Sequence, residues 1–305
     1  METEFNLSGW TPEAPDIRDF ILGDPDEQQI KDDRYTEMVK HYQDADVLDN
    51  DGFFSQLTLP SASHMKAFCS PVMNQGSLGS CTAQAAVSLY EFMENKKHGE
   101  FVDGSRLFVY KTTRNLMGLT GDTGATNRST IGALAIFGMP PETYWPYRIG
   151  QFDVEPSAFC YSFGQSFQAL RYARIDHSNR QGARLLSAVK TMVNFKIPMV
   201  FGFSVYRSIS RSRTTGKVPF PHARDRRRGG HAVLAVGYDD NIEIDNGHGM
   251  ISKGAILFQN SWGTGWGDDG FGWLPYDYVL KGLTRDWWTM YQMEYMDLRT
   301  IGARV

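Results

Sequence analysis

The sequence has few cysteines, and this narrows the class of protein. Cys69, Cys81 and Cys160 are the only three in 305 residues, too few for a fold held together by disulfides. A reducing compartment, or at most one disulfide, fits this content. The three also form no paired motif of the kind that holds a structural metal. We therefore expect neither a metal nor a cofactor.

Long hydrophobic stretches are missing as well. The longest apolar runs are short, for example 199–203 and 232–236, whereas a membrane span needs about 20 consecutive apolar residues. The first twenty residues contain no basic region followed by an apolar run, so no secretory signal is readable. We expect a protein that is neither integrated into a membrane nor exported by such a signal.

Charge is distributed unevenly along the chain. Residues 1–57, the acidic arm, hold 15 acidic and 4 basic residues, a net charge of −11, whereas residues 58–305 carry +7. Such asymmetry favours an interaction between charged parts, although a solvated tail would have the same charge. The acidic arm also contains Trp10, Phe20 and Ile21, which a purely solvating tail does not need.

The basic residues gather at one place, which we call the arginine cluster (207–228). It contains eight basic side chains: Arg207, Arg211, Arg213, Lys217, Arg224, Arg226, Arg227 and Arg228. A solvated loop accounts for them, since glycine and prolines lie between them. A nucleic-acid surface is disfavoured because aromatic residues are few there and no nucleic-acid motif is present. The cluster ends just before Gly230 and His231.

Hydrophobic periodicity predicts helices in the first half of the chain and strands in the second. Helices are expected after Cys81 up to Gly99, near 105–114, near 129–137 and over 183–195. Short apolar runs bounded by glycine, aspartate and proline predict strands at MVFGFSVY, HAVLAVGY, AILFQNSW and FGWLPY.

A glycine-rich turn, QGSLGS, delivers Cys81 to the start of a predicted helix. Unpaired backbone N–H groups and the positive end of the helix dipole favour a thiolate there. We therefore expect a lowered pKa for this thiol. A lone cysteine is more often an inert core residue, but the glycines favour close backbone approach to this one.

His231 opens one predicted strand and Asn260 closes another. If the two strands pair antiparallel around a loop at 238–253, His231 lies opposite Asn260 and Gly237 opposite Gly254. Opposite residues are about 5 Å apart, so the asparagine carbonyl could accept from the imidazole and fix its tautomer. A nucleophile, a base and an orienting group together are typical of thiol acyl transfer.

Three segments resemble the papain family of cysteine peptidases: PVMNQGSLGSCTA, GGHAVLAVGYDD and FQNSWGTGWGDDGFGWLPYDY. Their Cys, His, Asn order and spacing also agree. The resemblance runs from about 59 to about 278, and the start GWTPEAPDIRD is similar to that of signal-less members from bacteria and large DNA viruses. It implies a cysteine peptidase acting on proteins or peptides, located in the cytoplasm or packaged in a virion.

The resemblance also implies a role for each matching residue. Cys81 is the nucleophile, His231 its base, Asn260 the group that orients His231, and Gln75 an oxyanion donor. Trp262 shields the His–Asn contact, and the expected substrate-binding residues are Trp262, Trp266, Gly124, Gly230 and Ala232. Two positions depart from the family: Leu78 stands where secreted members have a disulfide cysteine, and Thr82 where a tryptophan is usual.

The implied fold is α+β and papain-like, a helical part facing an antiparallel, barrel-like strand-rich part across the active-site cleft. The expected division is an acidic arm (1–57) and a peptidase domain (58–305), with its helical part at about 70–165 and its strand-rich part at about 166–295. The resemblance further implies a zymogen in which the arm lies in or near the cleft. Arg226, Arg227 and Arg228 are the expected docking site for the arm or for a small polyanion.

Two other functions stay open. A deamidase or acyl transferase of the transglutaminase type also uses Cys and His, but usually with Asp, so Asn260 disfavours it. A catalytically inactive papain-like scaffold would serve binding alone, and the presence of all four expected active-site residues disfavours that reading.

Overall fold

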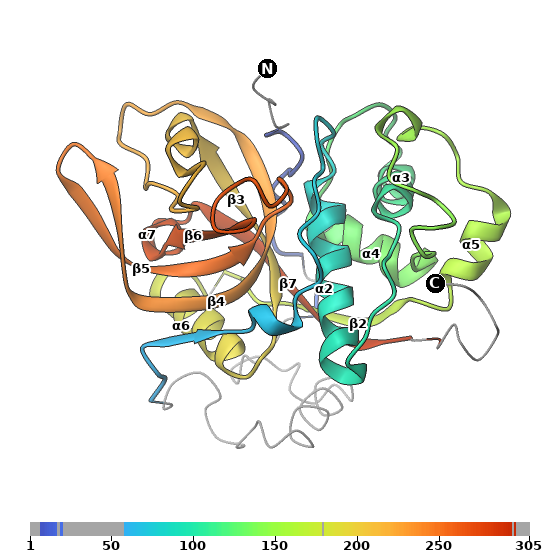
Figure 1. Ribbon diagram of the computed structural model, residues 1–305, viewed down its shortest axis with the longest axis horizontal. Coiled ribbons are helices and arrows are strands. Elements are labelled where there is room, and N and C mark those ends of the chain that lie inside the picture. The colour runs from blue at the N-terminus through green and yellow to red at the C-terminus, as the bar shows by residue number, and fades with distance from the viewer. Residues whose placement is uncertain (1–6, 17–18, 21–57, 179, 295, 297–305) are drawn as a thin grey trace.

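The computed structural model describes residues 7–16, 19–20, 58–178, 180–294 and 296. Within these residues, one half of the molecule is helical and the other is built on an antiparallel sheet. The two halves meet along helix α2 (Figure 1). The fold is therefore α+β and papain-like, as the resemblance implied. Ile21, one of the apolar arm residues, lies outside the described part.

The helical half comprises α2 (Cys81–His98), α3 (Arg106–Leu116), α4 (Asn127–Phe137) and α5 (Ala158–Gly164). Three of these agree with the periodicity, and only the short α5 was not predicted. Gly99 ends α2 in the left-handed conformation with φ of 75°, which glycine adopts without a side-chain clash. α2 is buried from its first residue to Glu94, because both halves of the molecule pack against it.

The other half is one sheet in the order β2-β7-β3-β4-β5-β6, with β1 paired to β4. The strands are β1 (Ala62–His64), β2 (Ala169–Arg174), β3 (Met199–Tyr206), β4 (Arg227–Gly247), β5 (Met250–Gln259), β6 (Phe271–Pro275) and β7 (Thr284–Met293). β3 matches its predicted run, whereas β2 and β7 were not predicted. Helices α6 (Gly182–Asn194) and α7 (Tyr276–Leu280) lie beside this sheet (Figure 1).

The described residues also contain three short 3-10 helices, η2 (Lys66–Phe68), η3 (Ile149–Gln151) and η4 (Arg207–Ser212). No helix among the described residues is long and apolar enough to span a bilayer.

The predicted pairing of β4 with β5 was right in direction and wrong in register. Leu234 faces Gln259 and Gly237 faces Leu257, so the strands are displaced by two residues at the first pair and three at the second. Irregularities between Ala235 and Gly237 and further along the hairpin cause the difference. A displacement of two residues keeps side chains on the same face, so His231 and Asn260 still meet.

Candidate active site

Cys81 lies at the first turn of α2, with its sulfur directed at the sheet. The backbone N–H of Ala232, one residue after His231 on β4, donates to its Sγ at 3.4 Å. Before the helix, the chain turns at Gly76, where φ is 60°. This turn brings the nucleophile loop, residues 75–80, against both halves of the molecule.

The imidazole of His231 is oriented by a hydrogen bond through one of its two nitrogens. Its Nε2 lies 2.8 Å from Oδ1 of Asn260, and that oxygen also accepts the N–H of Ser261. An amide oxygen can only accept, so Nε2 carries the proton. The other nitrogen, Nδ1, is buried and has no hydrogen-bond partner among the described residues. The ring is thus in the tautomer that leaves Nδ1 as a base.

Two tryptophan rings cover the hydrogen bond between His231 and Asn260. Trp262 stacks on the His231 ring with centroids 4.5 Å apart and an interplanar angle of 22°. Trp266 meets Trp262 edge-on at 5.1 Å, and both indoles are buried. Such packing keeps water away from the His–Asn hydrogen bond.

Gln75 is buried beside the start of α2 and is held by Ser261. Its Oε1 accepts from the Ser261 hydroxyl at 2.6 Å, and its Nε2 donates to the Leu78 carbonyl at 2.9 Å. The amide Nε2 carries two hydrogens, and this bond uses one of them. Ser261 therefore orients Gln75 and, through its N–H, Asn260; sequence reasoning did not single it out, although it lies within the QNSWG segment.

The acidic arm passes directly over the nucleophile. A Cβ added at Gly9 would lie 2.7 Å from the Cys81 sulfur, a separation that real side chains do not adopt. Leu7 accepts the Gly230 N–H at 2.7 Å, and Gly9 accepts the Ala125 N–H at 3.0 Å. Cys81 and His231 are consequently fully buried.

Trp10 follows Gly9 and fills the space next to the nucleophile. Its indole lies where a Cβ at Gly202 or Gly230 would stand, within 1.9 and 2.6 Å of its ring atoms. With Cys81 and Ala232 it forms a separate buried apolar cluster, and its Nε1 donates to Asp286 at 3.3 Å. The expected substrate-binding residues Gly230 and Ala232 thus contact the arm itself.

Gly124 also borders the arm. A Cβ there would lie 2.6 Å from the Ser8 carbonyl oxygen, and its φ of 70° is one that glycine adopts readily. The next residue, Ala125, exchanges backbone hydrogen bonds with the arm at Gly9 and Thr11. This turn therefore binds an extended chain by its backbone.

Burial by the arm reverses the predicted acidity of the nucleophile. We expected a lowered pKa, but burial raises the pKa of Cys81 to about 12, while nearby backbone N–H groups act in the opposite direction. Burial also lowers the pKa of His231 to about 4, although the hydrogen bond that its ring donates to Asn260 acts to raise it. The covered pair is therefore an uncharged thiol beside a neutral imidazole, and the prediction was wrong for this closed arrangement.

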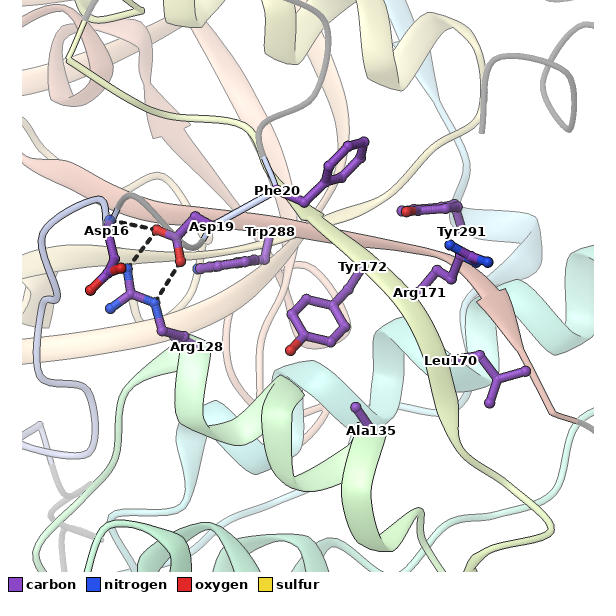
Figure 2. Close-up of a pocket in the computed structure, with 10 residues that line it drawn as sticks. All are labelled: Asp16, Asp19, Phe20, Arg128, Ala135, Leu170, Arg171, Tyr172, Trp288 and Tyr291. Atoms are coloured by element: carbon purple, nitrogen blue, oxygen red, sulfur yellow. Dashed lines mark hydrogen bonds and ion pairs between the residues drawn. The ribbon is translucent and has the colours of Figure 1, made fainter. Parts of the chain in front are cut away.

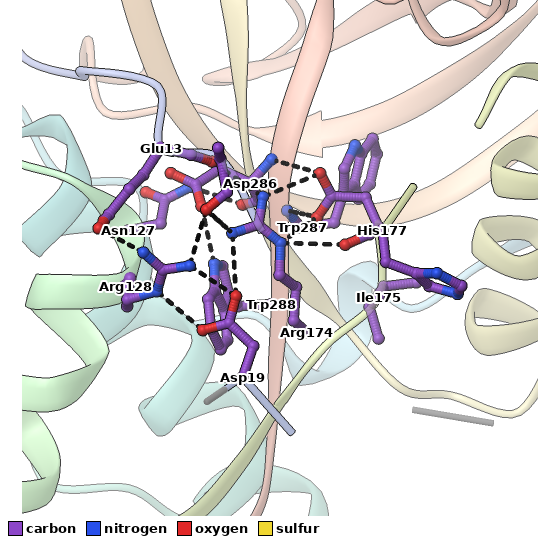
Figure 3. Close-up of polar contacts among 12 residues, drawn as sticks. Glu13, Asp19, Asn127, Arg128, Arg174, Ile175, His177, Asp286, Trp287 and Trp288 are labelled. Carbon is purple, nitrogen blue, oxygen red and sulfur yellow. Dashed lines mark hydrogen bonds and ion pairs between the residues drawn. The ribbon is translucent and has the colours of Figure 1, made fainter. Parts of the chain in front are cut away.

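Further along, the arm is held by ion pairs (Figure 3). Asp19 is nearly buried and pairs with Arg128 and, at 3.5 Å, with Arg174; Glu13 pairs with Arg128. The guanidinium of Arg174 is fully buried and also meets Asp176 at 3.1 Å and Asp286 at 3.3 Å. Two arginines of the body thus neutralise carboxylates of the arm and of the body together.

These contacts differ from the docking expected for the acidic arm. Its described carboxylates Glu13 and Asp19 pair with Arg128 and Arg174, not with Arg226, Arg227 or Arg228, which are exposed. The end of the arginine cluster does approach the arm, because Gly229 and Gly230 contact Leu7. The acidic residues at 2, 4 and 24–51 lie outside the described part.

Two hollows lie near these regions. One of about 530 Å³ borders the arm at Asp16, Asp19 and Phe20 and is otherwise lined by Arg128, Ala135, Leu170, Arg171, Tyr172, Trp288 and Tyr291 (Figure 2). The other, about 340 Å³, lies at the arginine cluster between Arg207, Arg211 and Arg224, with His222 and His248. The second has the charge expected of a polyanion site, which stays a prediction.

Comparisons with known proteins agree with this geometry. The family model described as papain family cysteine protease matches residues 60–281. The chain belongs to the papain family of cysteine proteases. It is a hydrolase that acts on peptide bonds, as the three sequence segments indicated.

The protease also resembles individual members. An uncharacterized peptidase C1-like protein of Acanthamoeba polyphaga mimivirus is 32% identical over 295 residues, covering 93% of this chain and 86% of that protein. Papain of Carica papaya is 28% identical over 68% of this chain and 51% of its own length. The crystal structure of xylellain, a cysteine protease from Xylella fastidiosa, superposes with a TM-score of 0.71 at 28% identity over 97% of this chain and 99% of that one.

Proposed function

We propose that Cys81, His231, Asn260 and Gln75 form the catalytic centre and that the acidic arm holds it inactive. The observation that carries the first part is the hydrogen bond that Nε2 of His231 donates to Asn260. This bond leaves Nδ1 of His231 free to act as the base. The Cys81 sulfur lies close by, because it accepts the N–H of Ala232, the residue after His231 on β4.

In this mechanism Nδ1 of His231 takes the proton of Cys81, and the thiolate attacks the substrate carbonyl carbon. The oxyanion receives the Cys81 N–H and the second hydrogen of Gln75 Nε2. His231 then gives its proton to the leaving amine, and a water hydrolyses the Cys81 thioester. A substrate chain would use the backbone groups of Ala125 and Gly230 that the arm now occupies.

Two substitutions test the assignment. With residues 1–57 deleted so that substrate can enter, Cys81→Ala should abolish turnover of a peptide substrate. In the full-length chain it should leave the thermal unfolding midpoint close to that of the parent. Gln75→Ala should mainly lower kcat, about a hundredfold, because its interaction strengthens as the oxyanion forms. Turnover retained by Cys81→Ala would refute the nucleophile assignment.

Covalent labelling and analysis of the reaction products distinguish the other two functions. An inactive scaffold would form no adduct with a thiol-directed peptidyl epoxide, whereas the proposed centre should form one on Cys81 once the arm is displaced. A deamidase or acyl transferase would release ammonia from a glutamine substrate without cleaving the chain. Mass spectrometry of the products separates cleavage from deamidation.

The arm part of the proposal rests on Gly9 and Trp10. Gly9 lies on the Cys81 sulfur, and Trp10 fills the adjacent space, so no substrate can approach while the arm stays in place. Deleting residues 1–57 should therefore raise activity on a small peptide substrate. A peptide with the sequence of the arm should then inhibit the truncated protein. A truncated chain that is folded but no more active would show that the arm is only a structural strap.

A further inference from the structure

The nucleophile loop 75–80 has no covalent attachment to the wall of the site that it faces. All three cysteines are free, and the side chain of Leu78, which is buried in the loop, belongs to the hydrophobic core. Yet the loop positions two groups that must be accurately placed, the Cys81 sulfur and the Cys81 N–H. Something other than a disulfide must fix it relative to the turn that binds the substrate backbone.

A single carboxylate spans this gap. Asp122 accepts the backbone N–H of Gly79 through both oxygens, at 2.9 Å and 3.1 Å. Gly79 is two residues before the nucleophile, and Asp122 belongs to the turn 121–124 that precedes Ala125. The hydrogen bond of a charged acceptor to a backbone N–H is stronger than that between neutral groups.

The turn itself is anchored to α3 by two residues one helical turn apart. The Tyr110 hydroxyl donates to Asp122 at 2.6 Å and accepts the Gly124 N–H at 3.1 Å. Arg114 donates to the Gly121 carbonyl at 2.6 Å, and its guanidinium lies 4.3 Å from the centre of the Tyr110 ring. Because α3 is a buried core helix, the turn is a rigid support.

We propose that Asp122 is a positioning residue for catalysis: it fixes the nucleophile loop to the turn that binds the substrate backbone. The chain Gly79–Asp122–Tyr110–Gly124 connects the reacting sulfur and the backbone-binding turn through three hydrogen bonds. Sliding of one relative to the other would separate a bound carbonyl from Cys81 and its N–H. The inference rests on Cys81 being the nucleophile, as proposed above.

This attachment has an electrostatic cost at the reacting atom. The negative charge of Asp122 acts to raise the pKa of Cys81, in addition to the larger effect of burial. An asparagine at this position keeps an oxygen that can accept the Gly79 N–H but removes the charge. The two substitutions at Asp122 therefore separate its geometric role from its charge.

The test compares Asp122→Ala, Asp122→Asn and Tyr110→Phe, each in the full-length chain and again with Gly9→Leu added to displace the arm. Asp239→Asn is the matched control, because Asp239 also accepts a backbone N–H, that of Asn241 at 2.7 Å, but lies on the β4–β5 hairpin and has no contact with Gly79 or the turn 121–124 among the described residues. The readouts are kcat and KM on a small peptide, and the pH dependence of Cys81 alkylation by iodoacetamide.

Asp122→Ala should lower kcat between about tenfold and a hundredfold, since a 1 Å misplacement can cost about that much, with KM changed less. Asp122→Asn should retain most of the turnover, and the alkylation midpoint should move to lower pH. Tyr110→Phe should fall in between, and Asp239→Asn should stay near the parent.

Unchanged kcat in Asp122→Ala overturns the proposal, as does an Asp122→Asn variant as slow as Asp122→Ala or an equal loss in Asp239→Asn. A loss that disappears in the Gly9→Leu chain would place the effect in the arm and also overturn it. A failure of the catalytic assignment itself shows separately, as turnover in Cys81→Ala.

Discussion

Within the described part of the arm, the first residues and the later ones are held by different forces. Residues 7–11 lie along the site by backbone hydrogen bonds and by an indole packed on glycines, with Gly9 against the nucleophile. Residues 13–16 and 19–20 are held mainly through the ion pairs of Glu13 and Asp19 to Arg128 and Arg174. In the inhibition proposed above, the first stretch blocks chemistry by occupying space, and the second keeps the first in place. Inhibition should therefore be abolished by shape changes in one and weakened by charge changes in the other.

The sharpest way to break the first stretch is Gly9→Leu. A side chain there would overlap the Cys81 sulfur and the Gly79 carbonyl, so the arm must leave. We expect activity of the full-length chain on a small peptide to rise about a hundredfold. Gly132→Leu is the control, since no atom lies within 4 Å of a Cβ at that position. Activity that stays at the parental level with Gly9→Leu would argue against a blocking arm.

Trp10→Ala should give the next largest rise. Truncating a buried tryptophan typically costs about 3–5 kcal/mol, and here only the closed arrangement loses that packing. We expect activation of at least tenfold, with little dependence on salt because the contact is apolar. An activation that vanished at high salt would contradict this assignment. Phe20→Ala is the comparison, since Phe20 is only partly buried against the core.

Charge removal in the second stretch should have a smaller effect. Asp19→Asn keeps oxygen and N–H groups near Arg128 and Arg174 but removes the charge, so we expect activation of about threefold to tenfold. The parental activity should also rise with added salt, because salt screens partly exposed ion pairs. Glu243→Gln, a carboxylate on the β4–β5 hairpin, is the control for net charge. Equal activation by both variants would refute the specific ion pair.

The pH dependence of inhibition should be the smallest effect. Burial raises the pKa of Asp286 to about 6, while Arg174 and the indole N–H groups of Trp288 and Trp10 oppose it. Without the arm, this carboxyl should move toward its ordinary pKa of about 3.9. At Asp286 the closed state therefore binds more protons, so this carboxyl favours closing below about pH 6 and the contribution is lost as the pH rises through that value. The lowered pKa of His231 in the closed state acts in the opposite direction.

The measurement is the ratio of parental to Gly9→Leu activity between pH 5 and pH 7, taken once with Asp286 and once with Asp286→Asn in both chains. The effect of His231 on this ratio is common to the two series, so their difference isolates Asp286. We expect the ratio to gain severalfold more with rising pH in the series that keeps Asp286. An Asp286→Asn series that rose as steeply would contradict the sign derived for Asp286.

Sequence patterns predicted the elements that carry the chemistry and missed others for identifiable reasons. α2 follows from its apolar face and Gly99, and β3 from a continuous apolar run between polar residues. β7 has no alternation to detect, because Trp287 and Trp288 are adjacent and both buried. The register of β4 with β5 depends on irregularities in the pairing. The local sequence does not show how many of these irregularities there are.

For the site, the residues came from motifs, whereas their electrostatics came from the fold. The start of α2 favours a thiolate, but the sequence alone does not reveal that Gly9 covers it, more than seventy residues away. Likewise Asp122 lies in an unremarkable turn, and its role depends on Gly79 and Tyr110 reaching it from two other segments. Long-range contacts of this kind leave no local signal.

The burial of α2 has a consequence for how the enzyme fails on heating. This helix contacts α3 and α4 on one side and β3, β4 and β7 on the other, and its first residue is Cys81, the proposed nucleophile. Neither half can melt without removing one side of the helix that carries Cys81. Loss of helical circular dichroism and loss of activity should therefore share one cooperative midpoint, because α2 joins the two halves and also carries Cys81.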